Sequence, residues 1–375
     1  MLKIVITGGH LTPALAVIDE LQKKKNWEVL YFGRKTAAEG DKAFSAEKGI
    51  IEKKGIKFVS LNAGRWQRKF TRYTIPAILR TPLGFAQSFF YLIKYKPNII
   101  LSFGSYVSVP VVLCGWLLDI PIVTHEQTSV RGLANKINSV FANKIAVSWS
   151  DTIGSYNKIK SVFTGNPIRN EIFTVSESFW KSLSFDNKLP LILVTGGNQG
   201  SHALNTAIAE VLPKLLEIAV VVHQTGQTEI NDDFERLIKI KEKLPKLLEG
   251  RYKVVKYLQS EEMGTLLNKS DLVISRAGAN TVYELAALGK PAILVPLPWL
   301  YQDEQTKNAS KLVEAGTSQI LAQRELTGEN LLFTVRNFLK NLPIYKKKAN
   351  KAKELVTLDA SKKIANLVEQ TAYDH

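Results

Sequence analysis

The chain has 375 residues, of which 45% are hydrophobic, so it is too long for one ordinary core and apolar enough to build two. A single cysteine, Cys114, excludes a disulfide framework and a cysteine metal cluster, and the five histidines show no metal-ligand spacing. No apolar run reaches the roughly 18 residues of a membrane-spanning helix, and the amino terminus enters a strand without a signal peptide. We therefore expect a soluble protein of a reducing, cytosolic-type compartment.

The net charge of +16 is concentrated between Glu52 and Asp119, a segment that contains no acidic residue. Basic residues are interleaved there with aromatic and aliphatic ones, as on a surface that rests on anionic lipid. An amphipathic helix that packs on a sheet and exposes a basic face is the alternative. Nucleic-acid binding is disfavoured because no binding motif accompanies the charge. The basic residues are Lys53, Lys54, Lys57, Arg65, Arg68, Lys69, Arg72, Arg80, Lys94 and Lys96.

The first predicted element is a buried strand at Lys3–Thr7, followed by a glycine turn at residues 8–10 and a helix from about Pro13 to Lys24. Thr12 is suited to cap this helix, with proline at its first position. Free backbone N–H groups and the helix dipole favour an anion at such a turn.

The next predicted strand, Glu28–Phe32, argues against a nicotinamide enzyme. It is followed by Gly33 and Arg34, where a dinucleotide site would place an acid for the ribose, and the first turn lacks a third glycine. Further along, four polar residues at 125–128 follow a buried strand, which is unusual for a simple connection. The other elements of this half are strands at Asn98–Phe103, Ile120–Thr124, Asn143–Val147 and Ser161–Phe163, a helix at Val109–Leu118 and a polar linker at Thr174–Lys188.

The second half repeats the alternation of strand, glycine turn and helix. Its elements are strands at Leu191–Val194, Ala219–Val222 and Tyr252–Tyr257, a glycine turn at 195–200, a helix at Ser201–Leu216 and a final lysine-rich helix at about Ile344–Glu369. The stretch Ser270–Ser310 adds a βαβ unit, with a helix from near Thr281 to Gly289 and a polar loop that carries Asp303, Glu304 and Gln305. We therefore predict two doubly wound α/β domains that face each other across a cleft, with ligands at the carboxyl ends of the strands.

Seven sequence motifs occur in an order and spacing that resemble the MurG family, the UDP-N-acetylglucosamine (UDP-GlcNAc) transferases of peptidoglycan synthesis within glycosyltransferase family 28. The resemblance runs nearly end to end. The motifs are TGGHLTPALAV at 7–17, GSYVSVP at 104–110, PIVTHEQT at 121–128, GNPIR at 165–169, TGGNQGSHALN at 195–205, SRAGANTVYELAALGKPAILVP at 275–296 and DEQTKNA at 303–309.

The resemblance implies a GT-B fold of two Rossmann-like domains, with the acceptor on residues 1–165, the donor on residues 166–345 and a final segment, 346–375, that packs back on the first domain. It implies inverting transfer of GlcNAc from UDP-GlcNAc to the MurNAc 4-hydroxyl of undecaprenyl-diphosphate-linked lipid I, forming lipid II. It also favours the anionic-membrane reading of the basic segment, and hence a peripheral location at the cytoplasmic face of the cell membrane. Cell-wall synthesis and division proteins are expected partners.

The resemblance also implies a set of donor-binding residues. Glu284 would bind the ribose hydroxyls, although Thr281 and Glu284 also spell a capping box. Gln305, assisted by Glu304, would read the sugar hydroxyls or simply occupy a solvated loop. Arg169 would lie near the uracil and phosphates, or form a surface ion pair. The full set is Thr7, Gly8, Gly9, Thr128, Arg169, Asn198, Leu258, Ala279, Asn280, Thr281, Val282, Tyr283, Glu284 and Gln305.

His10 and Glu126 are the two candidates for the general base that inverting transfer requires, and both remain open. No cofactor and no metal site are expected, with stimulation by a divalent cation such as magnesium left open. The chain departs from the family at Ser105, Thr128 and Asn198; each side chain can still hydrogen-bond, so we expect altered affinity with activity retained. The alternatives are a related UDP-sugar transferase with another lipid acceptor and a non-catalytic nucleotide-sugar-binding protein.

Overall fold

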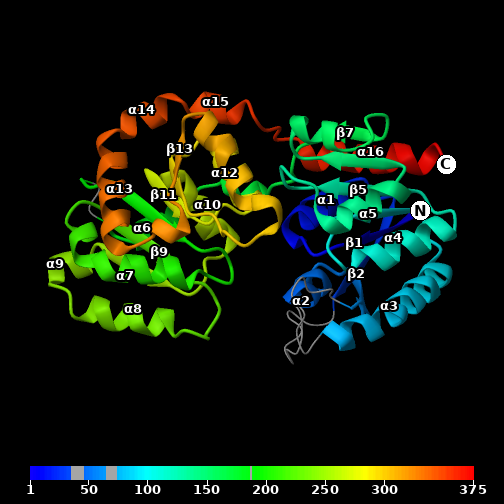
Figure 1. Cartoon of the computed structure of the whole chain (residues 1–375), viewed down its shortest axis with the longest axis horizontal. Coiled ribbons are helices and arrows are strands. Elements are labelled where there is room, and N and C mark those ends of the chain that lie inside the picture. The colour runs from blue at the N-terminus through cyan, green and yellow to red at the C-terminus, as the bar shows by residue number, and fades with distance from the viewer. Residues whose placement is uncertain (35–45, 65–73, 186–187) are drawn as a thin grey trace. The chain divides into compact units, whose positions relative to one another are not determined.

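The computed structural model describes residues 1–34, 46–64, 74–185 and 188–375, which fold into two compact units (Figure 1). The first unit comprises Met1–Ile168 together with Thr357–His375, and the second comprises Arg169–Val356. The unit boundaries therefore lie somewhat later in the chain than the expected ones at residues 165 and 345. Within the described residues, no helix is both long enough and apolar enough to cross a membrane.

The first unit is built on a seven-stranded parallel sheet with the order β3-β2-β1-β4-β5-β6-β7. The strand order reverses between β1 and β4, which is where open α/β sheets bind ligands at their carboxyl ends. The strands are β1 Leu2–Thr7, β2 Trp27–Arg34, β3 Lys57–Leu61, β4 Ile99–Ser102, β5 Ile122–Glu126, β6 Lys144–Val147 and β7 Ser161–Phe163. The helices are α1 Leu11–Lys23, α2 Ala46–Lys53, α3 Thr74–Tyr95, α4 Ser108–Leu117, α5 Leu133–Phe141 and α16 Ala360–Tyr373, with a 3₁₀ turn η1 at Ser150–Ser155.

Both faces of this sheet are buried, because successive side chains of a strand point to opposite sides. Ile4 and Ile6 of β1 pack in one core with α1 and α16, whereas Val5 packs in the other with α3 and α4. The last helix, α16, thus belongs to the first unit: Ile364 and Val368 are fully buried in that core.

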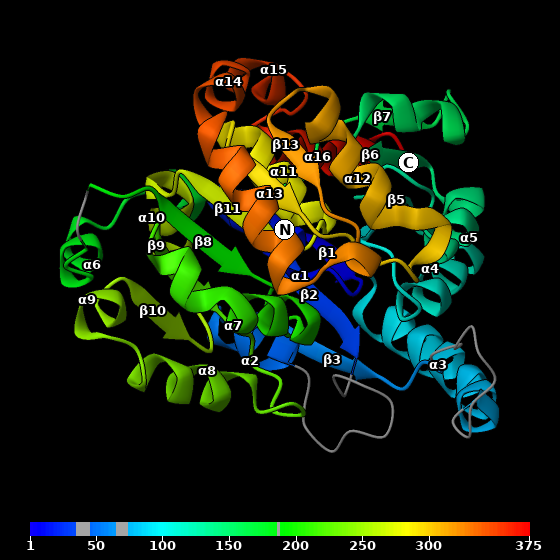
Figure 2. The same ribbon diagram turned by 60° about the vertical axis from the view of Figure 1, so that its left-hand side comes forward.

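The second unit is built on a six-stranded parallel sheet with the order β10-β9-β8-β11-β12-β13. Helices α7 and α13 pack against each other beside β8 (Figure 2). The strands are β8 Leu191–Thr195, β9 Val220–Gln224, β10 Tyr252–Val255, β11 Leu272–Ser275, β12 Ala292–Leu294 and β13 Ser318–Ile320. The helices are α6 Glu177–Ser182, α7 His202–Leu216, α8 Asp233–Glu242, α9 Lys246–Glu249, α10 Ser260–Lys269, α11 Ala279–Leu288, α12 Glu304–Glu314, α13 Gly328–Lys340, α14 Leu342–Lys347 and α15 Ala349–Lys353, with 3₁₀ turns η2 Asn170–Phe173, η3 Tyr301–Asp303 and η4 Gln323–Glu325.

Several sequence-based predictions of local structure were wrong. Helix α1 begins at Leu11 with His10 as its N-cap, so Thr12 does not cap it; proline is tolerated at the third position because first-turn N–H groups need no helical partner. The predicted final helix is divided into α14, α15 and α16, and the predicted linker contains α6. Glu304 and Gln305 lie in the first turn of α12 and not in a loop.

Candidate functional site

In the first unit, the backbone of the glycine turn between β1 and α1 lies close to the residues that follow β4. Gly8 has φ +145°, and a Cβ there would lie 2.8 Å from the Cβ of Phe103. A Cβ on Gly9 would lie 2.7 Å from the Oγ of Ser105. His10 follows as the exposed N-cap of α1, without a capping bond from its side chain. The turn therefore offers backbone and a helix N-terminus, which suit an anion.

A second turn follows β4 at the same edge of the sheet. Gly104 and Ser105 both have φ +70°, a left-handed conformation that is strained for serine. The Ser105 carbonyl accepts hydrogen bonds from the Ser108 backbone N–H at 3.1 Å and from its hydroxyl at 2.8 Å, which hold the turn against the start of α4. These bonds hold Ser105, one of the positions where the chain departs from the family, in its left-handed conformation.

Glu126, the last residue of β5, is 3% exposed and accepts hydrogen bonds on both carboxylate oxygens. Oε1 accepts from the N–H of Thr128 at 3.2 Å and from its hydroxyl at 3.1 Å. Oε2 accepts from the N–H of Gly132 at 2.8 Å, the side-chain amide of Asn135 at 3.2 Å and the hydroxyl of Tyr156 at 2.8 Å. The predicted site residues Glu126 and Thr128 therefore bind each other.

The neighbouring polar residues differ sharply in their surroundings. Burial lowers the pKa of His125 to about 4, so its imidazole is neutral near pH 7, with Nε2 3.1 Å from the Gly165 carbonyl oxygen. Gln127 is only 2% exposed, and in the part of the chain that the structure describes neither of its amide atoms has a hydrogen-bond partner. The hydroxyl of Thr7 is likewise buried without a partner among the described residues.

In the second unit, an ion pair joins two predicted donor-binding residues. Arg169 approaches a single oxygen of Glu284, with Nε at 3.3 Å and Nη2 at 3.1 Å from Oε1. Its Nη1 donates to the hydroxyl of Ser260, the first residue of α10, at 3.3 Å. Glu284 raises the pKa of Arg169. Among the described residues, Oε2 of Glu284 accepts no hydrogen bond.

The start of α11 excludes the capping role of Glu284. Gly278 is the N-cap, and the N–H of Val282 already donates to the Gly278 carbonyl at 3.0 Å, so Thr281 lies inside the first turn. No side chain caps this end, which leaves it suited to a phosphate. The predicted residues Ala279, Asn280 and Thr281 form that turn, whereas the side chains of Val282 and Tyr283 are fully buried in the core.

The glycine turn after β8 lies at the same edge as α11, because β8 and β11 are parallel neighbours. A Cβ on Gly200 would lie 1.9 Å from the Thr225 carbonyl oxygen. Asn198 is exposed on this turn. Beside it, Gln224 donates to the Gly197 carbonyl at 3.1 Å and accepts from the N–H of Leu258 at 3.1 Å, which ties the predicted Leu258 to the same edge.

Gln305 is 8% exposed, and its Oε1 accepts from the N–H of Leu297 at 3.0 Å, so its side chain orders the segment after β12. Arg276 directly follows β11 and, like Gln305, is buried and bonded to the backbone near the end of β12, but it was not among the predicted site residues. It is 9% exposed, donates to the Val295 carbonyl at 3.0 Å and forms no ion pair among the described residues; burial lowers its pKa to about 10.

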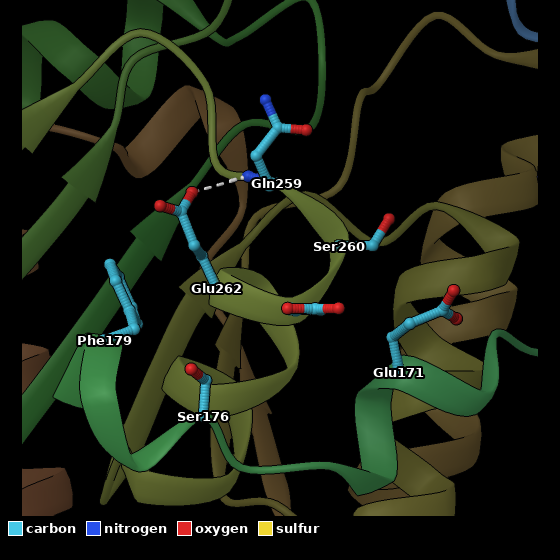
Figure 3. Close-up of a pocket in the computed structure, with 7 residues that line it drawn as sticks. Glu171, Ser176, Phe179, Gln259, Ser260 and Glu262 are labelled. Carbon is cyan, nitrogen blue, oxygen red and sulfur yellow. Dashed lines mark hydrogen bonds between the residues drawn. The ribbon is translucent and has the colours of Figure 1, made fainter.

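A cavity of about 460 Å³ adjoins the Arg169 ion pair through Ser260 (Figure 3). It lies between the start of α10 and residues 171–179, and its wall includes Glu171, Glu261 and Glu262. Three carboxylates disfavour a diphosphate there. The described residues hold no group of three His, Cys, Asp or Glu side chains that could bind a metal ion.

Comparison with known proteins decides the family. The model of the glycosyltransferase family 28 N-terminal domain matches residues 4–147, and that of the family's C-terminal domain matches residues 191–368. The chain belongs to glycosyltransferase family 28. A family member from Clostridium kluyveri named UDP-N-acetylglucosamine--N-acetylmuramyl-(pentapeptide) pyrophosphoryl-undecaprenol N-acetylglucosamine transferase is 33% identical, with 99% of each chain covered. A Bacillus cereus protein named as transferase 2 of the same kind is 34% identical over 92% of this chain and 94% of its own.

Solved structures agree on the fold. Acinetobacter baumannii MurG superposes with a TM-score of 0.71 at 24% identity, covering 99% of this chain and 100% of its own. The UDP-GlcNAc 2-epimerase from Neisseria meningitidis, bound to UDP-GlcNAc, gives 0.69 at 16% identity, with 99% and 100% covered. The GT-B fold and the resemblance found in the motifs are thereby confirmed.

The predicted family 28 site residues are divided between the two units. Thr7, Gly8, Gly9, His10, Glu126 and Thr128 lie in the first, and the remaining residues lie in the second. Sequence reasoning missed Asn135, Tyr156 and Arg276. Asn135 could have been recognised as a polar residue at a buried position of α5. Tyr156 could not, because it lies 30 residues from Glu126 and no local pattern connects the two.

Proposed function

We propose that the protein transfers GlcNAc from UDP-GlcNAc to the 4-hydroxyl of the MurNAc residue of undecaprenyl-diphosphate-linked lipid I, producing lipid II and UDP. The observation that carries this proposal is 33% identity over 99% of both chains to a protein named as that transferase. A nucleotide-sugar donor is further supported by three features of the second unit, which are the uncapped start of α11, the glycine turn after β8 and the pair of Arg169 and Glu284.

In the proposed reaction, the acceptor oxygen attacks the anomeric carbon from the side opposite UDP. A bond forms between that oxygen and the anomeric carbon, the bond from this carbon to the UDP oxygen breaks, and a base takes the hydroxyl proton. UDP leaves with the bonding electron pair, and its diphosphate is stabilised by the first turn of α11 and the glycine turn after β8. The free Oε2 of Glu284 accepts from the ribose hydroxyls.

We further propose that the enzyme binds the cytoplasmic face of the membrane through the first unit. Helices α3, α4 and α5 pack in sequence and expose large apolar side chains, which we call the α3–α5 apolar face. Arg80 and Lys94 accompany it on α3. Four of the ten basic residues identified from the sequence, Arg65, Arg68, Lys69 and Arg72, lie outside the described residues. The face consists of Leu83, Phe89, Phe90, Ile93, Trp116, Leu117, Leu133, Ile137 and Val140.

A matrix of donors and acceptors tests the proposed reaction. UDP release is measured with UDP-GlcNAc, UDP-GalNAc and UDP-glucose, each against a polyprenyl-diphosphate MurNAc-peptide acceptor and against a diacylglycerol acceptor. We expect release with UDP-GlcNAc and the MurNAc acceptor, and unchanged turnover in EDTA because no resident metal is proposed. Release only with another pair would identify a related lipid glycosyltransferase, and tight UDP binding without release in any pair would identify a binding protein.

A further inference from the structure

The carboxylate of Glu126 is surrounded by more hydrogen-bond donors than it has lone-pair sites to accept them. A carboxylate has about four lone-pair sites, and five donor groups lie within 3.2 Å of its oxygens. The Thr128 hydroxyl also lies 2.5 Å from the Val130 carbonyl, so its one proton is shared. The other four donors are two backbone N–H groups, an amide and a tyrosine hydroxyl. Three of these four donors bind Oε2, which is therefore fully occupied, and Oε1 accepts the N–H of Thr128.

The strongest side-chain donor to Glu126 is itself held in the donating form. Burial and the carboxylate raise the pKa of Tyr156, so its hydroxyl keeps its proton across the neutral range. Arg131 lies 4.7 Å from the centre of the Tyr156 ring and holds the ring in place. A proton taken from a substrate would neutralise the Glu126 carboxylate and weaken the charge-assisted hydrogen bonds from these buried donors, which is unfavourable.

The donors to Glu126 belong to the segment that follows it in the chain. Gly132 is the N-cap of α5 and has no side chain to cap that helix, and its N–H is directed to Glu126. Asn135, in the first turn of α5, donates also to the carbonyl of His125 at 3.0 Å. Through these hydrogen bonds Glu126 connects the end of β5 to the start of α5, and it thereby fixes the segment Gln127–Gly132 that lies between them.

This segment needs such an anchor because it contains an unfavourable group. Gln127 is buried with both amide atoms unpaired among the described residues, and an unpaired buried polar group destabilises the folded state. Groups of this kind persist where the surrounding structure holds them, and they occur at functional sites. An amide both donates and accepts, so it suits the hydroxyl and acetamido groups of a sugar.

We propose that Glu126 is a positioning residue, which holds the segment Gln127–Gly132 in place for the sugar acceptor and, through Thr128, for the donor, and does not take the acceptor's proton. The proposal rests on the proposed function for the identity of the acceptor. Glu126 and its donors Thr128, Gly132, Asn135 and Tyr156 are called the clamp below, and the geometry of the clamp does not depend on that function.

Kinetics of Glu126→Gln and Tyr156→Phe test the role in the reaction, with Tyr95→Phe as a matched control that removes a first-unit tyrosine hydroxyl not bonded to Glu126. We expect the acceptor KM to rise roughly tenfold in Glu126→Gln, and less in Tyr156→Phe. The acid limb of the kcat profile against pH should persist in both variants; it should stay at the wild-type pH in Tyr156→Phe and move to lower pH in Glu126→Gln, because the charge of Glu126 opposes the desolvation that lowers the pKa of His10. A kcat lower by about 10²- to 10⁴-fold with loss of the acid limb and an unchanged acceptor KM would instead make Glu126 the base.

Amide hydrogen exchange tests the clamp without turnover. The N–H groups of Thr128 and Gly132 should exchange faster in Glu126→Gln and in Tyr156→Phe than in the wild type and Tyr95→Phe. Unchanged exchange in Tyr156→Phe would overturn the proposal, even if Glu126→Gln fails to fold. Absence of product from the wild type would contradict the proposed function, while the exchange result would still decide the clamp.

Discussion

Arg169 binds only one of the two carboxylate oxygens of Glu284, with both of its contacting nitrogens 3.1 to 3.3 Å from Oε1. The pair is mostly buried, with 27% and 8% of the two side chains exposed. The ion pair orients the carboxylate, and its second oxygen accepts no hydrogen bond among the described residues. The sequence left open a ligand contact or a surface ion pair for Arg169; the structure shows an ion pair that is mostly buried, and the ligand contacts of both residues stay predictions.

Substitution of Glu284 by alanine should weaken UDP-GlcNAc binding by about tenfold or more, because the ribose loses its acceptor and Arg169 loses its partner. Calorimetry of UDP and UDP-GlcNAc binding measures the change, and circular dichroism checks the fold. Glu261→Ala, which removes an exposed carboxylate on the neighbouring α10, is the control. Unchanged affinity in Glu284→Ala would show that the carboxylate serves only Arg169.

Two buried histidines predict that the protein loses stability in mild acid. Burial lowers the pKa of His125 to about 4 and that of His223 to about 3, against an ordinary value of 6.5. Between about pH 6.5 and 4 the unfolded chain binds these protons and the folded chain does not, so unfolding becomes easier as pH falls. Each histidine contributes a slope of about 1.4 kcal/mol per pH unit.

Urea denaturation at pH 6.5 and 5.0 checks this prediction. His223→Gln should lower the pH dependence of the second unit's transition, whereas His375→Gln, which changes an exposed histidine, should leave it unaltered. A free energy of unfolding that rises on acidification from pH 6.5 to 5.0 would contradict the assignment of buried neutral imidazoles.

The close approach of the glycine turn to its neighbour predicts that Gly200→Ala is destabilising. Gly200 has φ +85°, and the added Cβ would meet the Thr225 carbonyl. We expect a loss of at least about 2 kcal/mol in the free energy of unfolding. Gly250→Ala is the matched control in the same unit, since its Cβ meets only ordinary contacts at 3.7 Å and beyond. Thermal melting of both variants measures the difference, and equal melting temperatures would show that the turn can relax.

Charge reversal beside the α3–α5 apolar face should weaken membrane binding. The double variant Arg80→Glu, Lys94→Glu is expected to bind anionic vesicles about 30-fold less tightly or weaker still, since each of the two lost basic residues contributes about 1 kcal/mol near such a surface. Sedimentation with vesicles of phosphatidylglycerol and phosphatidylcholine measures it. Lys239→Glu, Lys241→Glu on α8 of the second unit is the charge-matched control. Equal loss in both variants would indicate a general charge effect and no specific face.

The sheets and glycine turns could be predicted from the sequence because each depends on a local run of residues. The continuous apolar run Ile4–Ile6 indeed lies in a central strand, β1, and is buried on both faces. The capping box at Thr281 and Glu284 was wrong because the helix begins at Ala279, and a spacing of three residues cannot tell a cap from a first turn.

The clamp around Glu126 could not be predicted, because its donors come from the following loop, from α5 and from beyond β6. Only folding brings Tyr156 to within 2.8 Å of the carboxylate. Arg276 was missed for the same reason, since the sequence does not show that its guanidinium is buried without an ion pair among the described residues.

Analysis of the disaccharide product tests the central claim most directly. The full-length protein is incubated with UDP-[¹⁴C]GlcNAc and synthetic lipid I in anionic vesicles, and the released disaccharide is examined by mass spectrometry and NMR. We predict a lipid product heavier by one GlcNAc, with a β linkage to the 4-hydroxyl of MurNAc, and release of UDP in equal amount. No labelled lipid, or a linkage with retained α configuration, would contradict the account.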